Sequence, residues 1–214
     1  MTGGMSSEPS LATAVPTGNA YDKYATSNPI ERRLMEGFLR ALDACLPDTP
    51  PATVLEVGMG EAEIASRIRQ RYPGASIVGI DLPDPELAEA WDSKGIPGAF
   101  ADIARLPFPS GSFDLVLAIE VLEHVPDPDA ALRDLARVGR GSFVLSVPDE
   151  PIWRVANMAR GKYLRDLGNT PGHIQHWSQR SFRRQVAAHL DVDASVSPFP
   201  WTMVSARSRA TAHA

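Results

Sequence analysis

Residues 53–62, T-V-L-E-V-G-M-G-E-A, constrain the fold of this chain more than any other stretch. A short apolar run over residues 54–57 ends in two glycines, Gly58 and Gly60, and apolar residues at helical spacing follow over 64–72. The order strand, glycine turn, helix is typical of the first unit of a doubly wound sheet. Glycines permit a tight turn and let a ligand approach the backbone, and the unpaired N–H groups of the following helix point toward that ligand.

The glycine turn alone is also compatible with an ordinary strand-to-helix connection. It departs from the dinucleotide-binding fingerprint because Glu56 lies at the strand end and Ala62 stands where a third glycine is usual. A carboxylate in that place would repel a pyrophosphate but would suit a cationic or hydroxyl-bearing ligand. The downstream sequence therefore has to decide between these interpretations.

Downstream, strands and helices are expected to alternate. We expect strands at about 52–57, 76–80, 96–101, 113–119 and 142–147, and helices at about 29–46, 61–72, 86–91 and 128–138. A further helix over 182–190 and two strands at 192–196 and 202–206 would close the fold. This order predicts an α/β fold with a Rossmann-like, doubly wound sheet and an N-terminal helix.

The size and charge of the chain limit its domain organisation and the partners it is expected to bind. Its 214 residues suit one domain, which we expect to span residues 21–207, with a disordered N-terminus over 1–20 and a frayed tail over 208–214. The formal net charge of −5 gives no sign of nucleic-acid binding, and no apolar run is long enough to span a membrane. With no basic-then-apolar leader and one cysteine, the expected location is cytoplasmic.

Asp81 ends the second expected strand, in I-V-G-I-D-L. In doubly wound folds an acidic residue at this spacing after the glycine turn meets the hydroxyls of a ribose. The alternative is that Asp81 caps the helix that includes Glu86. The spacing favours the ribose role, although both roles are compatible.

Four stretches together resemble the class I S-adenosylmethionine-dependent methyltransferases. They are V-L-E-V-G-M-G, I-V-G-I-D-L, A-D-I-A-R-L-P-F-P-S-G-S-F-D-L-V-L and E-V-L-E-H-V, and they cover roughly residues 50–150. The resemblance implies a sheet of about seven strands with the last one antiparallel, and S-adenosylmethionine as the cofactor with S-adenosylhomocysteine as its product. Y-D-K-Y, S-V-P-D-E-P-I-W and G-N-T-P-G-H-I-Q-H-W also resemble a bacterial subset that methylates small molecules.

The resemblance also implies a set of cofactor-binding residues. Glu56, Gly58 and Gly60 would surround the methionine end, Asp81 would bind both ribose hydroxyls, and Leu82 would lie against the adenine. The other implied cofactor contacts are Asp102 at the adenine amino group, the Ile103 backbone at a ring nitrogen, and Ile119 with Glu120 along the fourth strand. Tyr21 and Tyr24 are interpreted either as an N-terminal lid over the cofactor or as surface-packed aromatics.

The acceptor side is expected after the fourth and fifth strands. Residues 148–177 interrupt the alternation and end in a polar loop, so we interpret them as a lid or substrate insertion. His124, Glu150, His173 and His176 are the candidate catalytic residues, because hydroxyl methylation needs a base or a metal. Each has an alternative structural role in holding a helix start or the loop. We assign no metal ligands, since the spacing of these side chains with Asp149 is not diagnostic.

These residues predict methyl transfer to O, N or C of a small-molecule metabolite, without nucleic-acid or membrane partners. The alternative is a cofactor-binding regulatory or partner protein that transfers nothing. A nucleic-acid or protein substrate is the weaker hypothesis, because the basic cluster that stands out is limited to Arg180, Arg183 and Arg184 on one helix. The acceptor and the oligomeric state are left unassigned.

Overall fold

The computed structural model describes residues 28–150, 152–153 and 172–209. The expected disorder of residues 1–20, both Tyr21 and Tyr24, and residues 154–171 of the expected insertion lie outside the described residues. Ser208 and Arg209, at the start of the segment expected to fray, hydrogen-bond to the Gly141 and Ala187 carbonyl groups.

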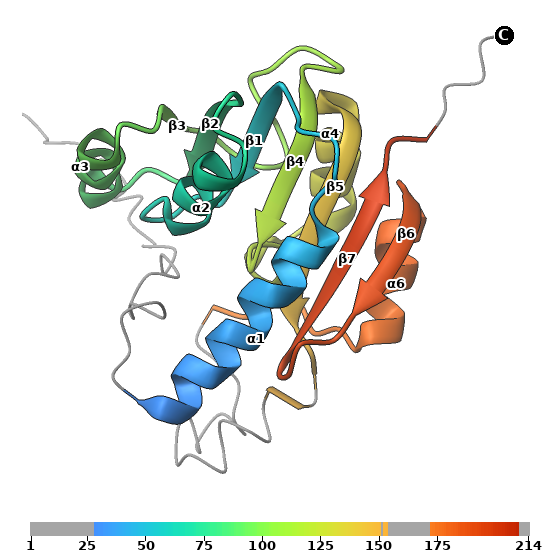
Figure 1. Ribbon diagram of the computed structural model, residues 1–214. Coiled ribbons are helices and arrows are strands. Elements are labelled where there is room, and N and C mark those ends of the chain that lie inside the picture. The colour runs from blue at the N-terminus through green and yellow to red at the C-terminus, as the bar shows by residue number, and fades with distance from the viewer. Residues whose placement is uncertain (1–27, 151, 154–171, 210–214) are drawn as a thin grey trace, which may run out of the picture.

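One mixed sheet of seven strands organises the domain, in the order β3-β2-β1-β4-β5-β7-β6 (Figure 1). The strands are β1 (Thr53–Val57), β2 (Ser76–Asp81), β3 (Gly98–Phe100), β4 (Phe113–Ile119), β5 (Gly139–Pro148), β6 (Asp191–Val196) and β7 (Trp201–Arg207). Strands β1 to β5 pair in parallel, whereas β7 runs antiparallel to both β5 and β6. The expected Rossmann-like sheet with an antiparallel last strand is therefore confirmed.

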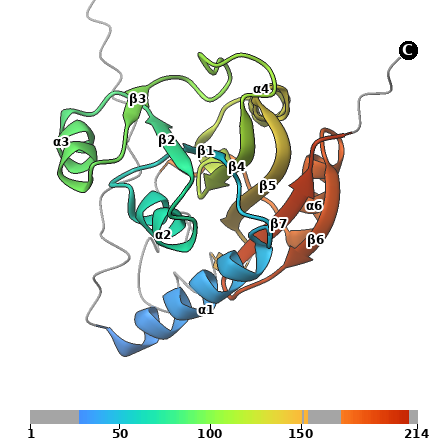
Figure 2. The same cartoon turned by 45° about the horizontal axis from the view of Figure 1, so that its top comes forward.

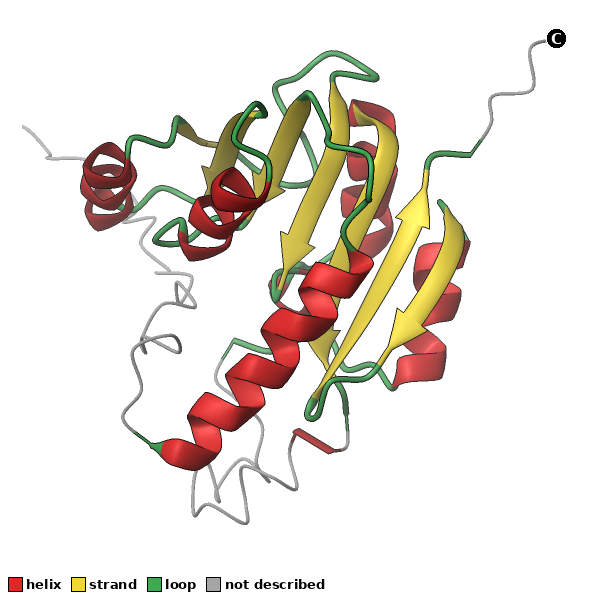
Figure 3. Cartoon of the chain, viewed as in Figure 1, coloured by secondary structure: helices red, strands yellow, loops and turns green. Residues whose placement is uncertain are grey.

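Helices cover both faces of this sheet (Figure 3). They are α1 (Pro29–Cys45), α2 (Glu63–Arg71), α3 (Pro85–Lys94), α4 (Pro128–Val138) and α6 (Gln179–Ala187), with a 3-10 turn η1 (Leu122–His124) after β4. The turned view shows α1 and α2 on one face and α4 and α6 on the other (Figure 2). No helix in the described part of the chain is both long and apolar enough to cross a bilayer.

Two apolar layers fill the space between sheet and helices, because both faces of the central strands are buried. Val54 and Leu117 face one layer, where they pack with Phe38 and Leu42 of α1. Leu55, Val116 and Phe143 face the other layer, where α4 and α6 contribute Leu132, Leu135, Phe182 and Val186. The strands are therefore held rigidly, and their ends form a fixed platform for side chains.

The helix starts explain two differences from the sequence expectation. Asp84, not Asp81, caps α3 by accepting a hydrogen bond from the Glu86 N–H at 3.0 Å. This cap leaves the Asp81 carboxylate available for the glycine turn. Helix α2 begins at Glu63, later than expected, because Ala62 adopts a left-handed conformation with φ of 62°. Asn28 and Asp127 cap α1 and α4 as expected.

Candidate active site

The glycine turn is pinned between β2 and the chain that leaves β4. The N–H groups of Gly58 and Met59 donate to the Ile80 carbonyl at 2.8 and 3.0 Å. Gly58 has φ of +70°, and a Cβ added there would lie 2.2 Å from the Val121 Cγ2. The glycine is therefore required both by the backbone conformation and by the closeness of Val121.

Asp81 fastens this turn to the end of β2. Its two carboxylate oxygens accept hydrogen bonds from the Gly60 and Leu82 N–H groups, each at 2.7 Å. Burial raises the pKa of Asp81, and these two N–H donors oppose that rise. Each carboxylate oxygen has two lone pairs, so Asp81 retains acceptor capacity for hydroxyl groups of a ligand.

Trp91 supports the same turn from α3, where its Nε1 donates to the Gly60 carbonyl at 2.7 Å. Sequence reasoning missed this residue, because nothing in the local pattern around Trp91 distinguishes a core tryptophan from one that holds a loop. Trp91 also packs against Phe100, with ring centroids 5.1 Å apart. Helix α3 is therefore part of the support of the site.

Glu56 is a buried carboxylate at the end of β1, with a relative exposure of 2%. Burial raises its pKa well above the usual range, Asp81 adds to that rise, and a backbone hydrogen bond from Ala65 opposes it. Its Oε2 atom has no hydrogen-bond partner within the described part of the chain. A buried acceptor without a donor is costly, so this position fits a ligand that brings a hydrogen-bond donor or a positive charge.

The residues expected near an adenine lie at the ends of β2 and β3. Leu82 is 44% exposed and Phe100 is 43% exposed, whereas Ile103 is buried. Asp102 accepts a hydrogen bond from the Ala104 N–H at 2.8 Å, and its side chain reaches solvent. The sheet edge therefore offers an apolar surface beside an accessible carboxylate.

Ile119 is the last residue of β4, and Glu120, which follows it, turns the chain with φ of 59°. Its carboxylate accepts hydrogen bonds from Trp201 Nε1 at 2.7 Å and from Ser146 Oγ at 3.4 Å. Trp201 lies 81 residues further along the chain, and sequence reasoning gave it no role. Glu120 thus links β4, β5 and β7 at the edge where the glycine turn lies.

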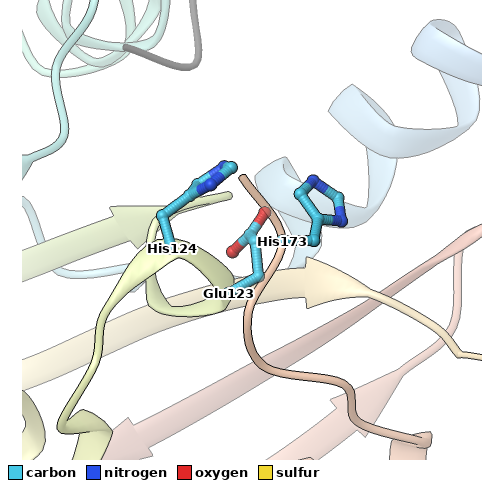
Figure 4. A group of neighbouring side chains, drawn as sticks. All are labelled: Glu123, His124 and His173. Atoms are coloured by element: carbon cyan, nitrogen blue, oxygen red, sulfur yellow. The ribbon is translucent and has the colours of Figure 1, made fainter. Parts of the chain in front are cut away.

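Glu123, His124 and His173 gather just beyond that edge (Figure 4). One ligand atom from each lies within 4.8 Å of the others. The His124 and His173 rings meet edge to face with centroids 4.9 Å apart, and the Trp153 ring stacks on His173 at 6.2 Å. Sequence reasoning singled out both histidines but missed Glu123, although E-V-L-E-H already placed it beside His124.

Glu150 and His176 form a second pair, with the His176 Nδ1 and Glu150 Oε1 atoms 3.7 Å apart. The Glu150 side chain is 8% exposed and that of His176 is 39% exposed. The Glu150 N–H donates to the Trp177 carbonyl at 2.8 Å, which holds the end of β5 against the loop that carries His176. Burial raises the pKa of the neighbouring Asp149, and a backbone hydrogen bond from Gln179 opposes that rise. The four expected acceptor-side residues are thus arranged as two pairs.

Comparison with known proteins agrees with the fold. Residues 55–145 match the family model described as a methyltransferase domain. The malonyl-[acyl-carrier protein] O-methyltransferase of Geobacter sulfurreducens is 34% identical over 122 residues, which cover 55% of this chain and 44% of that protein. The chain spans about half the length of the curated relatives it matches.

Solved methyltransferases share the fold. The Haloferax volcanii methyltransferase in complex with the Trm112 methyltransferase activator superposes with a TM-score of 0.67 at 19% identity, covering 84% of this chain and 92% of that one. Magnesium protoporphyrin IX methyltransferase from Synechocystis PCC 6803, solved with S-adenosylhomocysteine, gives 0.63 at 16% identity, covering 85% and 88%. The domain match over residues 55–145, the relatives of this identity and the strand order support a class I S-adenosylmethionine-dependent methyltransferase.

Proposed function

We propose that this protein transfers the methyl group of S-adenosylmethionine to a small-molecule acceptor. The observation that carries this proposal is the edge of the sheet at which β1, β2 and β4 end. There a glycine turn, the Asp81 carboxylate with spare acceptor capacity and the buried Glu56 carboxylate lie together, and Glu56 Oε2 has no hydrogen-bond partner among the residues that the structure describes. These groups complement the ribose hydroxyls and the ammonium group of the cofactor.

Each residue at this edge has a proposed role. Glu56 would meet the ammonium group, Gly58 and Gly60 would surround the methionine end, and Asp81 would accept from the ribose hydroxyls. The remaining proposed contacts are Leu82, Asp102 and the Ile103 backbone at the adenine, Ile119 and Glu120 along β4, and Tyr21 and Tyr24 as a lid. Leu82 suits the adenine because its exposed apolar surface would be covered by the ring.

The reaction is a displacement at the methyl carbon of the sulfonium. A lone pair of the acceptor forms a bond to this carbon while the carbon–sulfur bond breaks, and the electron pair of that bond stays on sulfur. The acceptor then loses its proton. Positioning supplies much of the rate because the leaving group is already good. The protein's contribution is to orient the acceptor and receive its proton. His176 suits the second task, because its imidazole is partly exposed and the Glu150 carboxylate lies 3.7 Å from its Nδ1 atom, where it would orient the ring.

A small-molecule acceptor agrees with the acidic balance of the chain, with a formal net charge of −5. The porphyrin methyltransferase that shares the fold is named for a small-molecule substrate. The atom that receives the methyl group stays open among O, N and C. The alternative function, a cofactor-binding regulator without transfer activity, would need only the cofactor side of the site.

The test is a transfer assay with S-adenosylmethionine that carries an isotopically labelled methyl group. The full chain is incubated with a bacterial metabolite extract, and new labelled compounds are sought by mass spectrometry. We expect at least one labelled small molecule that is absent when Asp81→Ala protein is used. Binding of S-adenosylhomocysteine without any labelled product would instead favour the regulatory alternative.

A further inference from the structure

We propose that Glu123, His124 and His173 form a binding site for one divalent transition-metal cation, which holds an oxygen atom of the acceptor. This inference deepens the proposed function, on which its catalytic part rests. The site uses two imidazoles and one carboxylate, a set that suits Zn²⁺ and several other divalent first-row ions. The acceptor is thereby narrowed to a molecule that presents an oxygen donor, such as a hydroxyl group.

The spacing of the three side chains is close to that of a bound site. One ligand atom from each lies within 4.8 Å of the other two. Ligand atoms around one such ion are roughly 3–4 Å apart, because each metal–ligand bond is about 2.0–2.2 Å long. A contraction of about 1 Å at the widest pair, within reach of side-chain rotation, would therefore complete the site.

The backbone already brings the two segments together. The Glu123 carbonyl accepts hydrogen bonds from the Ile174 and Gln175 N–H groups at 2.9 and 3.1 Å. The Gln175 side chain donates to the Val125 carbonyl at 3.2 Å. His173 is therefore held beside η1 by contacts on its carboxyl-terminal side, and Figure 4 shows it across the carboxylate from His124. A site held in this way is organised before a ligand arrives.

A hydrogen bond to a backbone carbonyl orients the His124 ring in a way that suits a metal ligand. Its Nδ1 atom lies 2.9 Å from the Gly172 carbonyl oxygen, and a carbonyl can only accept, so Nδ1 carries the proton. In the neutral ring the lone pair then belongs to Nε2, the atom that would bind a metal. Metal-binding histidines commonly make this kind of bond with the other nitrogen. Gly172, with φ of +89°, lets its backbone approach the ring closely.

The cluster is shielded from solvent. Glu123 is 2% exposed and His173 is 8% exposed. Because little water reaches these two side chains, solvent would compete weakly with them for a bound cation.

The cluster lies next to the glycine turn, where a bound cation could act on the acceptor. Turn η1 follows Glu120 and Val121, and Val121 packs directly on Gly58 of the glycine turn. Three protein ligands leave coordination positions open for the acceptor. A cation there would lower the pKa of an acceptor hydroxyl. Its proton would pass to His176, and the oxygen would take the methyl group in the displacement already described.

The test measures metal binding directly, without turnover. Metal-free full-length protein is titrated with Co²⁺, whose visible absorption reports imidazole and carboxylate ligation, and with Zn²⁺ by calorimetry. We expect one ion per chain, and a loss of affinity of about 100-fold or more in Glu123→Gln, His124→Ala and His173→Ala. His189→Ala is the matched control, because His189 binds Asp129 instead, and it should bind the ion as the wild type does.

Two outcomes would overturn the proposal: no binding by the metal-free wild type, or binding that survives all three substitutions. The first would leave the cluster as a set of structural contacts that hold the loop against η1. Circular dichroism of each variant identifies any that fail to fold. Glu123→Gln replaces the carboxylate with an amide of nearly the same shape, so a loss of metal binding in this variant would not come from misfolding. S-adenosylhomocysteine titration of the same samples shows separately whether the cofactor side works, so the two proposals fail independently.

Discussion

The cofactor side and the acceptor side of the site are built in different ways. On the cofactor side, Gly60 follows β1 and Asp81 ends the neighbouring β2, and the Gly60 N–H donates a hydrogen bond to the Asp81 carboxylate. On the acceptor side, His124 contacts a loop 48 residues further along the chain, and the Glu123 carbonyl accepts hydrogen bonds from the N–H groups of Ile174 and Gln175 in the same loop. The first arrangement comes from the sheet itself, whereas the second depends on how late segments of the chain fold back on it.

The largest expected effect is a loss of turnover, without a loss of cofactor affinity, when the acceptor side is changed. The double variant His173→Ala, His176→Ala should lower turnover by roughly 10²–10⁴-fold, the range that a general base contributes. Its affinity for S-adenosylhomocysteine should stay within about twofold of the wild type, because no proposed cofactor contact is removed. Turnover is followed with the labelled methyl group and affinity by calorimetry. Unchanged turnover would locate the acceptor chemistry elsewhere.

The next prediction concerns the cofactor side. Gly58→Ala should lower the free energy of unfolding by about 1–3 kcal/mol, because the new Cβ collides with Val121 and the residue keeps a left-handed backbone. Cofactor affinity should fall by at least about tenfold as the turn shifts. Gly74→Ala is the matched control, since a Cβ there meets nothing within 4 Å. Urea denaturation of both variants checks the difference, and equal stability would argue against the close packing of the turn.

Glu56 offers a test by pH. Its pKa is raised in the folded protein, so the ligand-free native state holds a proton that the unfolded chain has already lost. The free energy of unfolding should therefore fall as pH rises from about 4.3 toward the raised pKa of Glu56. Glu56→Gln should remove this loss, and it should be more stable than the wild type at pH 7 while it binds the cofactor about tenfold more weakly.

Urea denaturation of the wild type and Glu56→Gln between pH 5 and pH 8 measures that difference. Glu86→Gln, at an exposed position in α3, is the control and should follow the wild type. A Glu56→Gln protein that is less stable than the wild type at pH 7 would show that the carboxylate already has a partner in the absence of ligand.

The smallest expected effect is at the adenine side. Leu82→Ala should change the free energy of unfolding by less than about 0.5 kcal/mol, since the side chain is 44% exposed. It should weaken S-adenosylhomocysteine binding by about three- to tenfold through lost apolar contact. Calorimetry measures the affinity. An unchanged affinity would remove Leu82 from the proposed adenine surface.

Much of the fold, and the meeting of Asp81 with the glycine turn, could be predicted from the sequence because the signals are local. Apolar runs predicted the strands and helices, and Asn28 and Asp127 correctly indicated where α1 and α4 begin. Asp84 followed by Pro85 was an equally local signal that would have identified the cap of α3. The acceptor side carries no such signal, because the closeness of Glu123 to His173 follows only from tertiary folding. The same holds for the contact of Trp201 with Glu120, which nothing in the sequence near Trp201 indicates.

The central claim is that the carboxyl edge of the sheet binds S-adenosylmethionine. Its most direct test is calorimetric titration of the wild type and Asp81→Ala with S-adenosylmethionine and with S-adenosylhomocysteine. We predict micromolar-range binding by the wild type, weakened at least about 10–100-fold in the variant, because the loss of even one hydrogen bond to a charged carboxylate costs about 1.5–3 kcal/mol. A wild-type protein that binds neither ligand would contradict the claim and leave a methyltransferase fold without its cofactor.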